Sequence, residues 1–174
     1  MESKRAGDLM IPLSDYPHIP YWFTLRQAIA TLSGSQIEVA GRKSLPRAFL
    51  VFNQAYELLG IVYRRDILRG LEPKYLDAKS GEHRRTLFEV KADPNLLELS
   101  FDRLLVGLRE QAERPVGEVM RPITTTLRDD DHLMKIICEM VEKDLALIPV
   151  LKEGSVVGVV RSVDVLEEVA RIVL

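Results

Sequence analysis

Two aspartates, Asp66 and Asp164, occupy the same place in two similar segments of the chain. The segments are Gly60–Leu68, which reads GIVYRRDIL, and Gly158–Leu166, which reads GVVRSVDVL. In each, two β-branched apolar residues follow the glycine, and two apolar residues follow the aspartate where a helix is expected to begin. An aspartate at a helix start either caps the helix or faces a bound group, so both roles are open at both positions.

A second pair of similar segments, Ala6–Pro12 and Val116–Pro122, precedes the first pair in the same order. Such a repeat predicts two similar units that face each other, so any cleft between them would be made twice. The corresponding glycines are 53 residues apart in the first copy and 41 apart in the second. We place the 12 extra residues near 33–45, a stretch rich in serine, glycine and basic residues, and expect a surface excursion there.

No catalytic or metal-ligand spacing accompanies the two aspartates. His18, His83 and His132 are isolated in the sequence. The chain contains no Ser/His/Asp or Cys/His arrangement that can be argued from spacing, no P-loop and no dinucleotide-binding glycine fingerprint. We therefore expect a protein that is not an enzyme and that requires no metal or cofactor.

The composition is that of a soluble globular protein, with 174 residues, 47% of them hydrophobic and 29% charged. A net charge of -2 argues against nucleic acid as a partner, and no apolar run is long enough for direct membrane insertion. The single cysteine, Cys138, excludes an intrachain disulfide and favours a cytoplasmic location. Because its neighbours include Ile136, Ile137 and Met140, we expect its side chain to be buried.

The second copy, residues 114–174, has the more regular pattern. Pro122–Leu127 is short and β-branched and predicts a strand. The three acids Asp129–Asp131 could suggest a metal site, but an apolar helical pattern follows them, which favours a helix cap and first turn. Leu145–Leu151 and Val156–Val160 then predict a hairpin, and a closing helix follows, so the order is β-α-β-β-α.

The first copy, residues 1–71, follows the same order less regularly. Thr24 and Gln27 have the spacing of a capping box before an apolar helical stripe. Ala48–Phe52 and Leu58–Val62 predict the two paired strands.

Residues 72–113 form a connector between the copies. Its first half is polar and rich in turn residues, and the leucines that follow predict at least one helix. One β-α-β-β-α unit has too little interior to be stable alone, so the two units are expected to share a core. The sequence therefore predicts an α+β fold, with two β-α-β-β-α units packed about a pseudo-two-fold axis.

The ordered set of motifs resembles a tandem pair of CBS domains, also called a Bateman module. The motifs that carry this resemblance are Leu9–Pro12, Phe49–Val51 and Gly60–Asp66 in the first copy, and Val119–Pro122, Leu147–Val150 and Gly158–Asp164 in the second. The resemblance leaves the connector unexplained. It implies clefts that bind adenosine compounds such as AMP, ADP, ATP or S-adenosylmethionine, a homodimer, and a regulatory effect on a separate effector protein that the sequence does not name.

The resemblance also implies roles for individual residues. Asp66 and Asp164 occupy the position whose carboxylate accepts hydrogen bonds from the ribose hydroxyls. The adenine pocket of the second copy would include Thr124, Ala146 and Leu147.

The chain departs from the family pattern three residues before each aspartate. A small hydroxyl residue is usual there as a phosphate contact, but this chain has Tyr63 and Arg161. Arg161 offers a planar fork of donors to a phosphate, or is an ordinary surface arginine, whereas Tyr63 either stacks on a base or fills its cleft. The Arg161 copy is therefore the stronger candidate for a ligand cleft.

Two functions remain open on these residues. The chain is either a regulatory sensor that binds an adenosine-containing ligand between the units, or a degenerate pair that serves protein interaction and dimerisation without a nucleotide. The tyrosine and arginine at the hydroxyl positions favour the second alternative.

Overall fold

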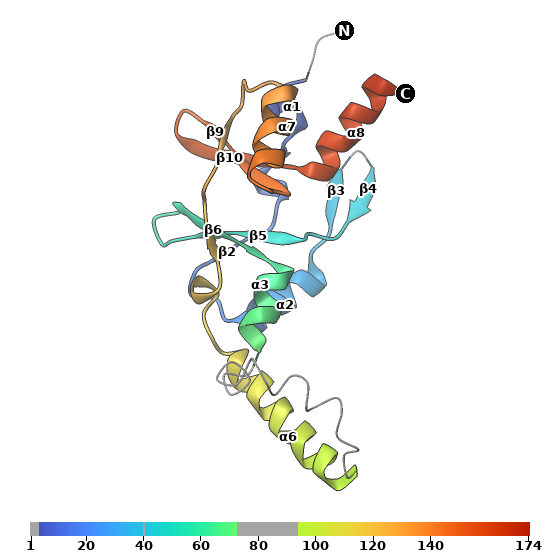
Figure 1. The fold of residues 1–174 in the computed structure, drawn as a ribbon. Helices are drawn as coiled ribbons and strands as arrows, with labels where there is room; N and C mark the ends of the chain where they lie inside the picture. The colour runs from blue at the N-terminus through green and yellow to red at the C-terminus, as the bar shows by residue number, and fades with distance from the viewer. Residues whose placement is uncertain (1–3, 40, 73–93) are drawn as a thin grey trace.

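The computed structural model describes residues 4–39, 41–72 and 94–174, which form two mixed sheets with helices packed on them (Figure 1). The strands of the first sheet are, side by side, β2 (His18–Pro20), β5 (Ala48–Phe52), β6 (Leu58–Tyr63) and β7 (Arg121–Pro122). The strands of the second are, in the equivalent order, β8 (Leu127–Arg128), β9 (Leu147–Lys152), β10 (Ser155–Arg161) and β1 (Ile11–Pro12). The expected α+β fold is confirmed.

Each copy contributes its first strand to the sheet of the other copy. Strand β1, near the N-terminus, pairs antiparallel with β10, and β7, which opens the second copy, pairs antiparallel with β6. The predicted single strand Pro122–Leu127 is therefore wrong. Its two ends pair in different sheets as β7 and β8, and the residues between them cross from one sheet to the other.

The exchanged strands explain why both copies share a glycine and a methionine. A Cβ atom added at Gly60 would lie 2.5 Å from the carbonyl oxygen of Arg121 and 3.0 Å from the sulfur of Met120. At Gly158 an added Cβ would be equally obstructed by the carbonyl of Ile11 and by Met10. Only glycine allows the exchanged strand to come this close.

The described core has three layers. Alternate residues of β5 face opposite ways, so Phe49 and Val51 pack beneath the helices while Leu50 faces the second sheet. Between the sheets, Leu50 packs with Leu147 and Val159 of the second copy. This shared middle layer explains why neither copy is a separate body.

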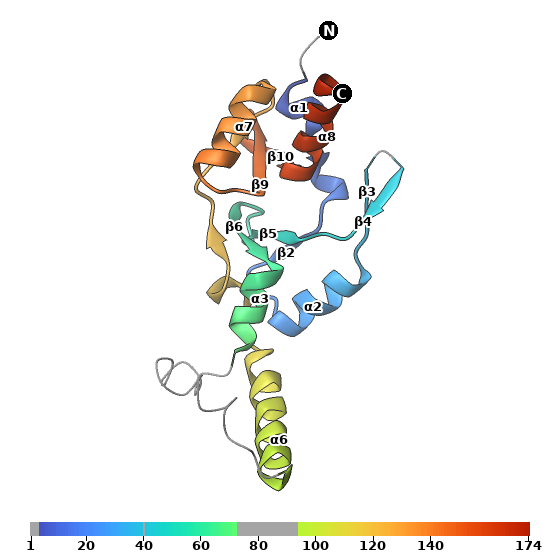
Figure 2. The same ribbon diagram turned by 45° about the vertical axis from the view of Figure 1, so that its right-hand side comes forward.

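All the described helices except α6 cover the outer faces of the sheets (Figure 2). The described helices are α1 (Ala6–Leu9), α2 (Leu25–Gly34), α3 (Arg64–Leu71), α6 (Pro94–Gln111), α7 (Leu133–Glu142) and α8 (Ser162–Val173), with 3₁₀ turns at Leu13–Asp15 and Val116–Glu118. The predicted capping box of α2 is confirmed, with Thr24 N–H donating to Gln27 Oε1 (2.9 Å) and Gln27 N–H donating to Thr24 Oγ1 (3.2 Å).

Two local predictions about α7 are wrong. The N-cap is His132, so Asp129–Asp131 precede the helix rather than form its cap and first turn. Asp131 instead accepts the Arg128 N–H (2.8 Å) and pairs with Lys135. Cys138 is exposed, because the positions of α7 that face the core are Leu133, Ile136 and Met140.

The link between α2 and β5 has 13 residues, 35–47, whereas the equivalent link between α7 and β9 has four, 143–146. The longer link contains a hairpin of β3 (Ile37–Val39) and β4 (Arg42–Ser44). It is not simply a surface excursion, because Ile37 is 1% exposed within the middle core layer.

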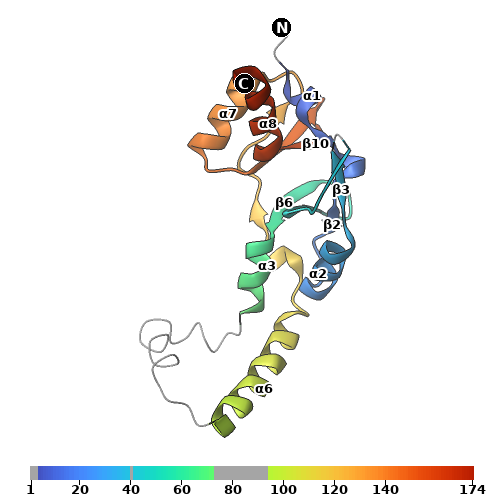
Figure 3. The ribbon, with the colours of Figure 1, turned by 90° about the vertical axis from the view of Figure 1, so that its right-hand side faces the viewer.

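The helix expected in the connector is α6, which extends away from the two sheets (Figure 3). Residues 73–93, the rest of the predicted connector, lie outside the described residues.

Candidate functional site

A cavity of about 480 Å³ lies between the two copies. The first copy contributes Ile61, Tyr63 and Arg65, from the end of β6 and the start of α3. The second contributes residues 121–125, which cross between the sheets, and residues 144–147, which lead into β9. This volume is in the range of pockets that hold small molecules.

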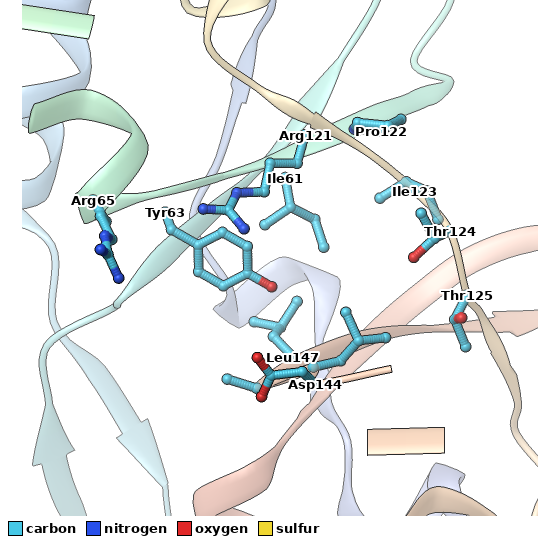
Figure 4. Close-up of a pocket in the computed structure, with 12 residues that line it drawn as sticks. Ile61, Tyr63, Arg65, Arg121, Pro122, Ile123, Thr124, Thr125, Asp144 and Leu147 are labelled. Atoms are coloured by element: carbon cyan, nitrogen blue, oxygen red, sulfur yellow. The ribbon is translucent and has the colours of Figure 1, made fainter. Parts of the chain in front are cut away.

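One end of the cavity is cationic and aromatic. Ile61 and Tyr63 are two residues apart on β6, so both side chains point the same way, and Arg65 lies beside them on α3 (Figure 4). The guanidinium of Arg121 stands over the Tyr63 ring, 5.3 Å from its centroid. Such a site offers positive charge to an anion and a ring face to a flat group.

The remaining walls are mainly apolar. Pro122, Ile123, Leu145 and Leu147 line them. In Figure 4 the threonines at 124 and 125 lie across the cavity from Tyr63. The Oγ1 atom of Thr125 is buried and has no hydrogen-bond partner among the described residues. A buried hydroxyl usually has a partner, and this atom is not exposed to the cavity in the structure.

Arg121 also pairs with Asp66, behind the cavity wall. Its Nε donates to Oδ1 (2.8 Å) and Oδ2 (3.0 Å) of Asp66, whose side chain is 0% exposed. The Tyr63 N–H donates to the same carboxylate (3.1 Å), so Asp66 stabilises the start of α3 from its third residue rather than as the N-cap.

Burial and the neighbouring charges together shift the pKa of Tyr63. Burial raises the pKa of the Tyr63 hydroxyl above its ordinary value, and the Arg121 cation opposes this shift only in part. At neutral pH the phenol therefore remains protonated and able to donate a hydrogen bond.

The equivalent residues of the second copy are arranged differently. Arg161 takes the place of Tyr63, and its Nε and Nη2 donate to Asp164 Oδ2 and Oδ1, each at 2.7 Å. Its remaining nitrogen, Nη1, donates to Ser44 Oγ (3.0 Å) on the β3–β4 hairpin. Neither Arg161 nor Asp164 lines the cavity at Tyr63.

Comparisons with known proteins identify this architecture. A family model described as the CBS domain matches residues 116–171. An uncharacterized protein of Methanocaldococcus jannaschii is 33% identical over 72 residues, which are 39% of this chain and 34% of the relative. The chain thus spans about a third of the length of that relative.

The solved structures extend the match to both copies. A CBS domain structure from a membrane protein of Sphaerobacter thermophilus is 23% identical, with a TM-score of 0.64, and the match covers 95% of this chain and 87% of that chain. Residues 116–171 match the CBS domain, and the chain as a whole has the fold of a tandem pair of CBS domains.

Two further CBS structures with this fold contain nucleotides. CBSX2 of Arabidopsis thaliana, in complex with AMP, matches with a TM-score of 0.60 and 16% identity over 97% of this chain and 98% of that chain. The cytosolic domain of the Mg²⁺ channel MgtE, in complex with ATP, matches with a TM-score of 0.60 and 21% identity over 95% of this chain and 49% of that chain.

The CBS pair groups the sequence-predicted site residues across the two copies rather than within each copy. Thr124, Ala146 and Leu147, which the sequence assigns to the cleft of the second copy, line the cavity together with Tyr63. The reason is the crossing segment, because Thr124 lies between β7, which pairs in the first sheet, and β8, which pairs in the second.

From the sequence, Arg65 could belong with Arg64 to a phosphate-facing patch or be an ordinary exposed charge, and Arg121 has no predicted site role. Arg121 belongs to a motif that was recognised, but its pairing with Asp66 depends on the strand exchange. The sequence does distinguish Arg121 from its counterpart. The equivalent position in the first copy is the apolar Ile11, so a charged residue at 121 is a departure from the repeat.

No group of three or more His, Cys, Asp or Glu side chains could hold a metal ion within residues 4–39, 41–72 and 94–174. Over the same residues, no helix is long and apolar enough to span a membrane. CBS pairs in general serve as regulatory modules.

Proposed function

We propose that this CBS pair is a non-catalytic regulatory module that binds an adenine nucleotide in the cavity between Tyr63 and Ala146. The observation that carries the proposal is the polarity of the cavity. Apolar walls suited to a base lead to an end with two arginines suited to phosphate. The AMP and ATP complexes of two proteins with the same fold support this choice of ligand.

The two arginines narrow the choice of ligand. AMP, ADP and ATP carry negative phosphates that match Arg65 and Arg121, whereas the sulfonium of S-adenosylmethionine has a single acidic counterpart in the lining, Asp144. We therefore favour a phosphorylated adenosine over S-adenosylmethionine.

Ribose recognition by Asp66 requires a change of partner. In the structure its carboxylate is buried beneath Arg121, which already lines the cavity. We propose that a ligand phosphate draws Arg121 away from Asp66, and that the freed carboxylate then accepts the ribose hydroxyls. Binding would thus replace the Arg121–Asp66 ion pair with an Arg121–phosphate ion pair. The contact between β7 and α3 that Arg121 and Asp66 make would then be lost. A ligand regulates only through such a difference between two states.

One observation favours the alternative function, a degenerate pair used for protein interaction without a nucleotide. Both motif aspartates are paired with arginines, Asp66 with Arg121 and Asp164 with Arg161. If these ion pairs are permanent, neither carboxylate is available to a ribose.

Calorimetric titration with AMP separates the two functions. We expect Arg65→Ala to weaken binding about tenfold to a hundredfold, because each hydrogen bond to a charged group contributes about 1.5–3 kcal/mol. The matched control is Arg64→Ala, which removes an exposed arginine next in sequence that does not line the cavity. An unchanged affinity in Arg65→Ala refutes this site, and the absence of heat with AMP, ADP and ATP favours the interaction function.

We further propose that the protein acts as a cytoplasmic homodimer and passes its signal to a separate effector protein. Exposed apolar side chains on α7 and α8, including Met134, Val141, Leu166 and Val173, support a self-association surface. Sedimentation equilibrium tests the proposed homodimer directly, and a monomer at all concentrations would refute the dimer.

A further inference from the structure

The cleft of the second copy is the counterpart of the cavity. Arg161 stands opposite Leu147 in its hairpin, as Tyr63 stands opposite Ala48 in the first. If the two copies were used alike, a second ligand would lie between Arg161 and Ala48.

Side chains of the chain itself fill the region around Arg161. Tyr16 is 2% exposed, and its hydroxyl donates to the carbonyl of Ala48 (2.8 Å). Its pKa is raised above the ordinary value, mainly by burial, and both Arg161 and Asp164 act on it electrostatically. The Tyr16 ring packs with Ala48 and Val159 in the middle core layer. Ala48 is the counterpart of Leu147, which lines the cavity of the other copy, so Tyr16 occupies the space that corresponds to that cavity.

The β3–β4 hairpin closes the same region from outside. Ile37 is 1% exposed and packs in the middle core layer with Tyr16 and Val159. Ser44, which stands opposite Ile37 in the hairpin, accepts the hydrogen bond from Arg161 Nη1. Ile37 thus supplies apolar contact, and Ser44 supplies an acceptor to the cation.

A further contact fastens the hairpin to α8. Arg42 Nη1 pairs with Glu167 Oε1 at 2.9 Å, one turn beyond Asp164. Figure 2 shows the hairpin rising from the first sheet to the level of α8. The hairpin belongs to the link 35–47 between α2 and β5, which is nine residues longer than the equivalent link 143–146. The extra residues of the first copy therefore cover the second cleft.

We infer that the hairpin is a built-in occupant of the second cleft, and that each chain therefore binds one nucleotide. This inference rests on the proposed function for the other cleft. Arg161 has its fork on Asp164 and its third nitrogen on Ser44, so the groups that would grip phosphate and ribose already have partners within the chain. At the Tyr63 cavity, by contrast, Arg65 lines an open volume of about 480 Å³.

Titration calorimetry of the full chain with AMP tests the inference through its stoichiometry. We expect one AMP per chain, with the binding heat reduced by Arg65→Ala and unchanged by Asp164→Asn. Two AMP molecules per chain, or binding lost in Asp164→Asn and retained in Arg65→Ala, would overturn the inference.

An opened variant provides the second arm. Residues 35–47 are replaced by the four-residue link 143–146, and Arg161→Thr restores a small hydroxyl. We expect this variant to bind a second AMP. If it still binds one AMP per chain, Tyr16→Ala is added, because the Tyr16 ring also occupies the cleft. A count that stays at one with all three changes in a folded chain contradicts occlusion by the hairpin.

The two proposals fail in different ways. If the native chain binds no AMP and the opened variant binds one, the Tyr63 cavity is refuted and the occlusion is upheld. If both bind none, both proposals are refuted. If the opened variant does not fold, the number of AMP molecules bound by the native chain and by Asp164→Asn still shows whether the second cleft binds a nucleotide.

Discussion

Replacing Arg121 with methionine should destabilise the protein markedly, because the change leaves a buried carboxylate without its main partner. Asp66 is 0% exposed and receives three contacts from Arg121. After Arg121→Met its remaining contacts within the described part of the chain would be the Tyr63 N–H at 3.1 Å and the exposed Arg69 at 3.4 Å.

The magnitude follows from burial. Removing one partner of a buried ion pair costs about 3–5 kcal/mol. Since the Arg121 side chain is 49% exposed, we discount this figure to about 2–3 kcal/mol for solvent screening. For a chain of this length, that loss lowers the thermal midpoint by about 4–12 °C.

The assay is thermal unfolding followed by circular dichroism. The matched control is Arg128→Met, which breaks the exposed pair with Asp130, a pair whose side chains are 73% and 52% exposed. We expect that change to cost less than about 1 kcal/mol. The double variant Asp66→Asn with Arg121→Met should recover much of the loss, because no charge is then left buried. Equal midpoints for Arg121→Met and Arg128→Met would refute this reasoning.

Three further predictions test the fold. Gly60→Val should cost about 1–3 kcal/mol or more in urea unfolding, because its Cβ would meet the Arg121 carbonyl at 2.5 Å; a neutral result would contradict the close strand contact. Thr24→Ala should cost about 1 kcal/mol through loss of the α2 cap, and Thr24→Ser should retain most of it. Burial alone would raise the pKa of Asp131, but hydrogen bonds including that from Lys135 hold it below its ordinary value. Its stabilisation is therefore present above the unfolded pKa and lost as pH falls through the folded pKa, so Asp131→Asn should destabilise at pH 7 and not near pH 2. A pH-independent difference would refute this.

Local sequence patterns predicted most of the elements. Ala48–Phe52 forms the strand that its β-branched and aromatic residues indicate, and the cap at Thr24 begins α2 as expected. These features depend on residues close together in the chain, where spacing and side-chain type determine the structure.

The exchange of strands between the sheets was not predictable from local pattern. Arg121 and Pro122 belong by sequence to the second copy but pair with Gly60 and Ile61 of the first. A β-branched run shows that a strand forms but not which sheet it joins. The error in the predicted strand 122–127 has this cause.

The composition of the candidate site depended on the same long-range pairing. The sequence identified Tyr63, Thr124 and Leu147 as candidates, and the structure brings these three to one cavity. The sequence favoured the Arg161 cleft over the Tyr63 cleft as the ligand site, because an arginine fork suits phosphate. The structure gives that fork to Asp164, three residues further on, and gives the remaining nitrogen to Ser44, 117 positions away.

The central claim, that the nucleotide binds between Tyr63 and Ala146, is tested most directly by a crystal structure of the full chain with AMP. We predict density for one AMP per chain, with its base against the apolar walls near Leu147 and its phosphate between Arg65 and Arg121. We also predict that Arg121 has moved from Asp66 to the phosphate. Density at Arg161 with the Tyr63 cavity empty, at AMP concentrations that saturate binding in solution, would contradict the account.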